Sequence, residues 1–288
     1  MKPLSSRLSL PILASLAAGA LTFSPASAQA SGVGSCPAVV IVAARGSDQN
    51  REQGEYLGPQ QYAPGTSPSN GFEGRNLSGL FHLVEKRHPA AMESVYVLAL
   101  DDTVYPATME LPALAQEGEE LSPVRFVQRL GEILRQYPLP ELVYSTAAGF
   151  IDSVRKGQEN APRAVDDYEA STGCTPSYIT AGYSQGAIVT TSLEPHLEAT
   201  GRLQGAMYLG NPLESVPSFV LPQQAEAPHR LNYCLHGDFT CDLNAESARA
   251  ALSNRAALHA SYFQGEPSAD DAQVADELAG WIKEAKAN

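Results

Sequence analysis

Short apolar runs alternate along the chain with stretches in which apolar residues recur at helical spacing. Five runs rich in apolar and β-branched residues predict strands over residues 38–43, 94–100, 177–182, 204–210 and 230–235. The first of them, AVVIVA, has no polar position, which is typical of a strand buried on both faces of a sheet.

Helical spacing between these runs predicts amphipathic helices. Three segments have an apolar stripe at this spacing: Leu77, Leu80, Phe81 and Val84; Ala147, Phe150, Ile151 and Val154; and Val274, Leu278, Trp281 and Ile282. A further helix is expected over residues 122–134. Strands that alternate with helices indicate an α/β fold with a mainly parallel sheet covered on both faces. Functional sites in such sheets lie at the carboxyl ends of the strands.

The N-terminus has the pattern of a secretory signal sequence. Lys2 and Arg7 precede a largely apolar run that ends in the small residues of 26–30. A membrane anchor is the alternative, but the run is shorter than the roughly 20 apolar residues that span a bilayer. We therefore expect residues 1–30 to be a signal peptide and residues 31–288 to form one domain without a membrane span.

Charge narrows the class of partner. Without Lys2 and Arg7, the 19 basic residues drop to 17 against 32 acidic ones, a formal charge of −15. Such a surface repels phosphate backbones and disfavours nucleic acid as a partner.

Residues 107–122 contain four glutamates and fit no period, so they are interpreted as a solvated acidic loop, with a lid over the site as the alternative.

Four cysteines in an exported chain indicate disulfides. Four cysteines allow three pairings, and the short separation of Cys234 and Cys241 favours a small loop, which leaves Cys36 with Cys174. A zinc site is the alternative, but the chain has no C-x-x-C pair and its histidines are not at ligand spacing. No metal is expected.

The pentapeptide at 182–186, GYSQG, matches G-x-S-x-G. It follows a predicted strand and begins a predicted helix over 185–198, the setting of a nucleophile elbow. The alternative is an ordinary strand-to-helix turn with a capping serine. The surrounding strand and helix favour Ser184 as a nucleophile.

A nucleophilic serine needs a histidine base that a carboxylate orients. In this setting the chain order is serine, acid, histidine. His259 has such an acid upstream, Asp238, inside the loop that a Cys234–Cys241 disulfide would close. Asp242 is the rival acid, and His229 and His236 are less suitable as bases because no acid stands at a strand end just before them.

An oxyanion hole needs two donors. The backbone N–H of Gln185, directly after the nucleophile, is the first. The loop after the strand 38–43 reads Ala44-Arg45-Gly46-Ser47, and Ser47 could supply the second with its N–H and its hydroxyl. A plain turn with a polar cap is the alternative.

Taken in order, these segments resemble the cutinase family of serine esterases. The matching stretches are 44–47, Cys174 with 182–187, Gly237-Asp238 with Cys241, and His259 with Tyr262. The resemblance implies a catalytic triad of Ser184, Asp238 and His259, an oxyanion hole from Ser47 and Gln185, and disulfides Cys36–Cys174 and Cys234–Cys241. It also implies an α/β-hydrolase-like three-layer sandwich around a five-stranded sheet.

The chain is longer than compact fungal cutinases between residues 105 and 142, and the stretch from 238 to 259 also looks long. In these respects it is closer to actinobacterial cutinase-like proteins. Because both regions are expected near the cleft, the resemblance does not extend to a substrate.

The sequence therefore predicts a secreted serine esterase that hydrolyses acyl esters through an acyl-enzyme and needs no cofactor. It is expected to act as a monomer on an ester or lipid, outside the cell or at the cell envelope. Two alternatives remain at this point. One is an acyltransferase, phospholipase or thioesterase acting on envelope lipids, and the other is a non-catalytic secreted binding protein.

Overall fold

The computed structural model describes residues 35–109, 139–215, 225–242, 244, 247 and 256–287, with the backbone alone for residues 139–147 and 256. The chain divides into two units, residues 1–34 and 35–288, and all described elements belong to the second. The predicted signal sequence, most of the acidic segment and the helix expected over 122–134 lie outside the described residues.

The core of the second unit is a parallel sheet of five strands. The strands are β1 (Val39–Ala44), β2 (Val95–Ala99), β3 (Ser177–Tyr183), β4 (Leu203–Leu209) and β5 (His229–Tyr233). They lie in the order β2-β1-β3-β4-β5, and every neighbouring pair is parallel. The predicted α/β class and the five-stranded parallel sheet are confirmed, with strand ends within two residues of the predicted ones.

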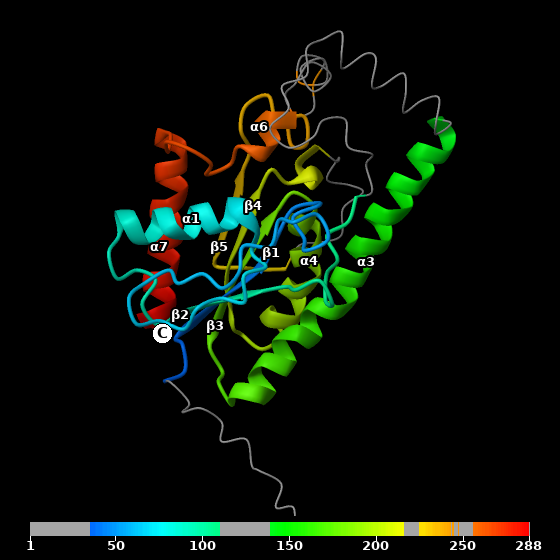
Figure 1. The fold of residues 1–288 in the computed structure, drawn as a ribbon. Coiled ribbons are helices and arrows are strands. Elements are labelled where there is room, and N and C mark those ends of the chain that lie inside the picture. Colours follow the sequence, from blue (N-terminus) through cyan, green and yellow to red (C-terminus); the bar gives the residue numbers. More distant parts are fainter. Residues whose placement is uncertain are drawn as a thin grey trace, which may run out of the picture. The chain divides into compact units, whose positions relative to one another are not determined.

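Helices cover both faces of the sheet (Figure 1). The described helices are α1 (Gly74–Arg87), α3 (Leu139–Thr172), α4 (Gln185–Glu198), α6 (Ala256–Ala260) and α7 (Ala269–Ala287), with a 3₁₀ turn η1 at Pro212–Ser215. Apolar residues of α1 and α7 form one buried cluster with the sheet, and those of α3 and α4 form a second cluster. The result is a three-layer arrangement.

Strand β1 shows why the sheet is stable. All six of its residues are fully buried, because helices cover both of its faces. Burying a Val or Ile side chain contributes about 1.5–3 kcal/mol. Edge strand β5, by contrast, has no fully buried position.

One residue of a predicted core stripe does not face the core. Ile151 was expected to face the core, but it is 62% exposed on α3. Helix α3 has 34 residues and is about 51 Å long, whereas the longest described strands have seven residues and span about 23 Å. The helix is thus too long to pack on the sheet throughout, and its fully buried apolar positions, Ala161 and Val165, lie in its second half.

Candidate active site

Ser184 stands at a sharp turn between β3 and α4. Its backbone has φ 54° and ψ −121°, a conformation that costs a non-glycine residue on the order of 1–3 kcal/mol. Tight packing enforces the turn, because a Cβ on Gly182 would lie 2.5 Å from Ala187 Cα and a Cβ on Gly186 would collide with the Ala44 carbonyl. Both glycines of the pentapeptide are therefore required by the backbone, as a nucleophile elbow needs.

Three side chains from distant stretches meet at this turn. His259, in α6, has Nε2 2.8 Å from Ser184 Oγ and Nδ1 2.7 Å from Asp238 Oδ2. Asp238 is fully buried and Ser184 is 6% exposed. Because carboxylate Oδ2 can only accept, Nδ1 carries the ring proton and Nε2 is left to accept the serine proton.

The carboxylate of Asp238 is held by several donors. Thr240 N–H donates to Oδ1 over 3.0 Å, and the Tyr262 hydroxyl donates to Oδ2 over 2.7 Å. Burial acts to raise the pKa of Asp238, but the hydrogen bonds and charge of His259, together with these donors, lower that pKa below its ordinary value. The group is thus ionised when the site is assembled.

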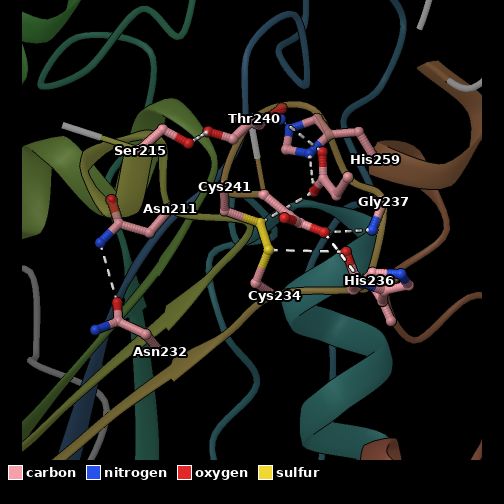
Figure 2. The surroundings of a disulfide bond; sticks show 12 residues. Asn211, Ser215, Asn232, Cys234, His236, Gly237, Thr240, Cys241 and His259 are labelled. Atoms are coloured by element: carbon pink, nitrogen blue, oxygen red, sulfur yellow. Dashed lines mark hydrogen bonds and ion pairs between the residues drawn. A yellow bond between two sulfur atoms is a disulfide. The ribbon is translucent and has the colours of Figure 1, made fainter. Parts of the chain in front are cut away.

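A disulfide closes the loop that carries this carboxylate. Cys234 and Cys241 are bonded, and Figure 2 shows the ring that they close beside His259. The second disulfide joins Cys36 to Cys174, across 138 residues. The short ring restricts the backbone around Asp238, which is how a scaffold fixes an orienting group.

The rival residues lie apart from the triad. Asp242 accepts a hydrogen bond from the Gly237 N–H and pairs with His236, whose side chain is 98% exposed. His229 pairs with Glu284 of α7. Neither histidine ring hydrogen-bonds to Ser184 Oγ, whereas His259 does, so the geometry favours His259 and Asp238 as the partners of Ser184.

The loop after β1 lies against the elbow. A Cβ on Gly46 would be 3.4 Å from Ser184 Cβ. The next residue, Ser47, has a buried Oγ without a hydrogen-bond partner in the part of the chain that the structure describes. Buried hydroxyls are nearly always paired, so an unpaired one in the loop that contacts the elbow is a candidate donor to a bound group.

The side chain of Gln185 is occupied elsewhere. Its Oε1 accepts from the Tyr105 hydroxyl over 2.6 Å and from Ser153 Oγ over 3.2 Å, and its Nε2 donates to the Thr108 carbonyl. Only its backbone N–H can therefore serve an oxyanion. That N–H is one of the first four of α4, which have no partner within the helix.

Three residues of the site carry no role in the sequence motif. The Tyr183 hydroxyl donates to the His259 carbonyl over 2.6 Å, and its ring stacks on the imidazole at 5.2 Å. Tyr262 bonds Asp238 as described. Gly210 has φ 54°, and a Cβ there would lie 2.8 Å from His259 Cε1. The G-x-S-x-G motif accepts any residue at position 183, so it does not indicate the contact that Tyr183 makes with His259. For Tyr262, the sequence offers only its position three residues after His259.

The direction of the Asp238 pKa shift predicts how stability depends on pH. A carboxyl with a lower pKa in the folded state stabilises the fold above its unfolded pKa of about 3.9 and loses this effect as the pH falls through the folded pKa. In urea unfolding between pH 7 and pH 3, the stability advantage of the wild type over Asp238→Asn should narrow toward the acid end. A constant difference over this range would contradict the shift.

Within the described ranges, no group of three or more His, Cys, Asp or Glu side chains could hold a metal ion, and all four cysteines are in disulfides. No helix in the same ranges is long and apolar enough to cross a membrane.

No family model and no curated protein matches this chain. Among solved structures, the chain is similar to a Trichoderma reesei cutinase in complex with a C11Y4 phosphonate inhibitor, at 15% identity and a TM-score of 0.40, over 87% of this chain and 77% of that one. It is also similar to lysin B from Mycobacteriophage D29, at 14% identity and a TM-score of 0.36, over 86% and 90%. These identities and TM-scores are too low to carry a function over from either protein.

Proposed function

We propose that this chain is a serine esterase that hydrolyses carboxylic acyl esters through an acyl-enzyme. The observation that carries the proposal is the unbroken series of contacts from Ser184 Oγ through the His259 ring to Asp238 Oδ2, at 2.8 and 2.7 Å. The proposal is also supported by the strained elbow and by the Ser47 hydroxyl, which has no hydrogen-bond partner among the described residues. A capping serine at an ordinary turn requires none of these features.

Acylation begins when Ser184 Oγ attacks the ester carbonyl carbon. His259 Nε2 takes the Oγ proton, and the carbonyl oxygen becomes an oxyanion that Ser47 and the Gln185 N–H stabilise. As the intermediate collapses, the bond to the alcohol oxygen breaks and His259 gives its proton to the leaving alcohol. Asp238 stabilises the charged imidazole that forms in between.

Deacylation repeats the sequence with water. His259 Nε2 takes a proton from water, whose oxygen attacks the acyl carbon, and a second oxyanion forms at the same donors. The bond to Oγ then breaks, Ser184 recovers its proton from His259, and the carboxylic acid leaves. One site thus serves both steps, and the kinetics are ping-pong.

We place this activity outside the cell. Disulfides form and persist in oxidising compartments, and this chain has two. The predicted signal sequence over residues 1–30 points the same way.

Ser47→Ala should separate activity from stability. Removing the hydroxyl should lower kcat for ester hydrolysis by about 10²- to 10³-fold, the typical loss for one oxyanion donor. The free energy of unfolding should hardly change, because Ser47 Oγ has no hydrogen-bond partner in the described part of the chain. Steady-state kinetics and urea unfolding measure the two quantities.

Thr180→Val is the matched control for Ser47→Ala. Thr180 Oγ1 is another buried hydroxyl without a partner among the described residues, but it lies inside β3. Thr180→Val should leave kcat unchanged and should not lower stability, because it removes a buried hydroxyl that has no partner among the described residues. A normal kcat for Ser47→Ala would show that the Ser47 hydroxyl does not contribute to the oxyanion hole.

The experiment that tests the proposed function is a series of p-nitrophenyl esters with acyl chains of increasing length. The wild type should release p-nitrophenol and the free acid, and His259→Ala should keep only the small residual rate that the oxyanion donors and substrate binding provide. Addition of a competing alcohol distinguishes hydrolysis from acyl transfer, because a transferase would yield the new ester. A folded wild type without activity on any ester of the series would contradict the proposal.

A further inference from the structure

The backbone around His259 is held by side chains from other elements. We define residues 259–262 as the histidine segment. Tyr183 of β3 donates to the His259 carbonyl over 2.6 Å. Asn76 of α1 donates from Nδ2 to the carbonyls of Ala260 and Tyr262, at 2.9 Å each. Contacts from two elements thus fix three of the four carbonyls of this segment.

Asn76 is fully buried, and both N–H groups and the oxygen of its amide are hydrogen-bonded. Its two N–H groups go to the histidine segment, and its Oδ1 accepts from Gln49 Nε2 over 2.6 Å. Asparagine is a weak helix former, so its place inside α1 is not explained by helix propensity. Residues 76–78 (Asn-Leu-Ser) match the acceptor sequence for N-glycosylation. In this fold, however, the Asn76 side chain is fully buried and hydrogen-bonded.

Gln49 extends the connection to the other side of the site. Its Oε1 accepts from the Gly46 N–H over 3.2 Å, and Gly46 directly precedes Ser47. Space for this side chain comes from Gly74, where φ is +72° and a Cβ would collide with Gln49 Oε1. One pair of amides therefore links the loop after β1 to the histidine segment.

We propose that Gln49 and Asn76 are positioning residues that hold His259 and the oxyanion loop in one fixed relation. The name amide bridge is used here for this pair. The inference rests on the proposed function, because the bridge matters only if His259 and Ser47 act on the same substrate. Neither residue belongs to the motifs that predict the triad, and neither contacts Ser184 Oγ.

The amide bridge is expected to affect the rate of ester hydrolysis because it fixes the position of His259 relative to Ser47. In the transition state, His259 must be within hydrogen-bonding distance of Ser184 Oγ while Ser47 is within hydrogen-bonding distance of the oxyanion. A shift of one group relative to the other therefore reduces the stabilisation of the transition state. A misplacement of about 1 Å can cost about 10²-fold in rate. A buried amide pair is suited to prevent it, because its hydrogen bonds are directional and water does not compete for them.

Asn76→Ala tests the proposal in the full chain. It should lower kcat for p-nitrophenyl ester hydrolysis by about 10- to 100-fold while KM changes by less than about twofold, as expected when transition-state geometry and not ground-state binding is lost. The matched control is Asn160→Ala in α3, which removes an amide that donates to the Val104 carbonyl. That variant should keep the wild-type kcat.

Gln49→Ala is the second variant, and it leaves both contacts of Asn76 with the histidine segment in place. If Asn76→Ala does not fold, Gln49→Ala still tests whether the amide bridge affects kcat. It should also lower kcat with little change in KM. The effects of the two substitutions should not add in the double variant, since either one breaks the same bridge. Normal kcat in a folded Asn76→Ala or Gln49→Ala variant, or strictly additive losses, would overturn the proposal.

Proton NMR provides a readout that general destabilisation does not move. The proton shared by His259 Nδ1 and Asp238 should give a strongly downfield resonance in the wild type and in Asn160→Ala. In folded Asn76→Ala it should broaden or disappear, and an unchanged resonance there would overturn the bridge. A wild type that shows this resonance but hydrolyses no ester would contradict the proposed function and not the bridge.

Discussion

Replacement of Ser184 by alanine is expected to lower kcat for ester hydrolysis by a factor of about 10⁴ to 10⁶, as for other triad nucleophiles. No other hydroxyl within the described residues contacts the His259 ring, so no group can take over the attack. The expected residual rate comes from the oxyanion donors alone. Steady-state kinetics with a p-nitrophenyl ester, on protein of verified fold, measures the loss.

The stability of Ser184→Ala should be close to that of the wild type. The backbone N–H of residue 184 donates to the Leu209 carbonyl, and this bond survives the substitution. Ser192→Ala in α4 is a suitable control, because its hydroxyl bonds only nearby backbone carbonyls in the described part of the chain. A Ser184→Ala variant as active as Ser192→Ala would refute the assignment of the nucleophile.

Asp238→Asn is expected to lower kcat by about 10⁴-fold, the effect of a wrong histidine tautomer. The Thr240 N–H requires an acceptor at the Oδ1 position, so the new NH₂ group takes the position of Oδ2. There it faces His259 Nδ1, which must give up its proton to accept. Nε2 then carries the proton toward Ser184 and cannot act as a base.

Asp242→Asn is the matched control for this prediction. Asp242 lies in the same stretch of chain, but its carboxylate contacts His236 and the Gly237 N–H. The substitution should leave kcat nearly unchanged at neutral pH. If Asp242→Asn lost activity and Asp238→Asn kept it, the acid of the triad would have to be reassigned.

The fold could be predicted from sequence to a large extent, because local patterns determine it. AVVIVA has no polar position and is rich in β-branched residues, which favours a strand covered on both faces. The spacing within 77–84 favours a helix with one buried face. The pentapeptide, with the strand before it and the helix after it, also indicated the elbow. Gly182 packs on the nearby Ala187, but the contacts that require Gly186 come from Ala44 and Arg45, which are far away in the sequence.

Long-range contacts made by residues outside the recognised motifs were not predictable. Asn76 and Ala260 are separated by 184 residues, and nothing near Asn76 in the sequence indicates that its amide is buried against them. Ile151 is exposed because α3 is longer than the sheet that it covers. The apolar periodicity of residues 147–154 gives no information about this difference in length. The interpretation of residues 110–122 as a loop or lid stays a prediction, since they lie outside the described residues.

The most direct test of the central claim is covalent labelling with a fluorophosphonate, followed by peptide mapping. An activated serine attacks phosphorus, whereas a serine without a base does not react at a comparable rate. We predict one adduct, on Ser184, in the folded wild type, and its loss in His259→Ala. An adduct on a different residue, or an unlabelled Ser184 in the folded protein, would contradict the account.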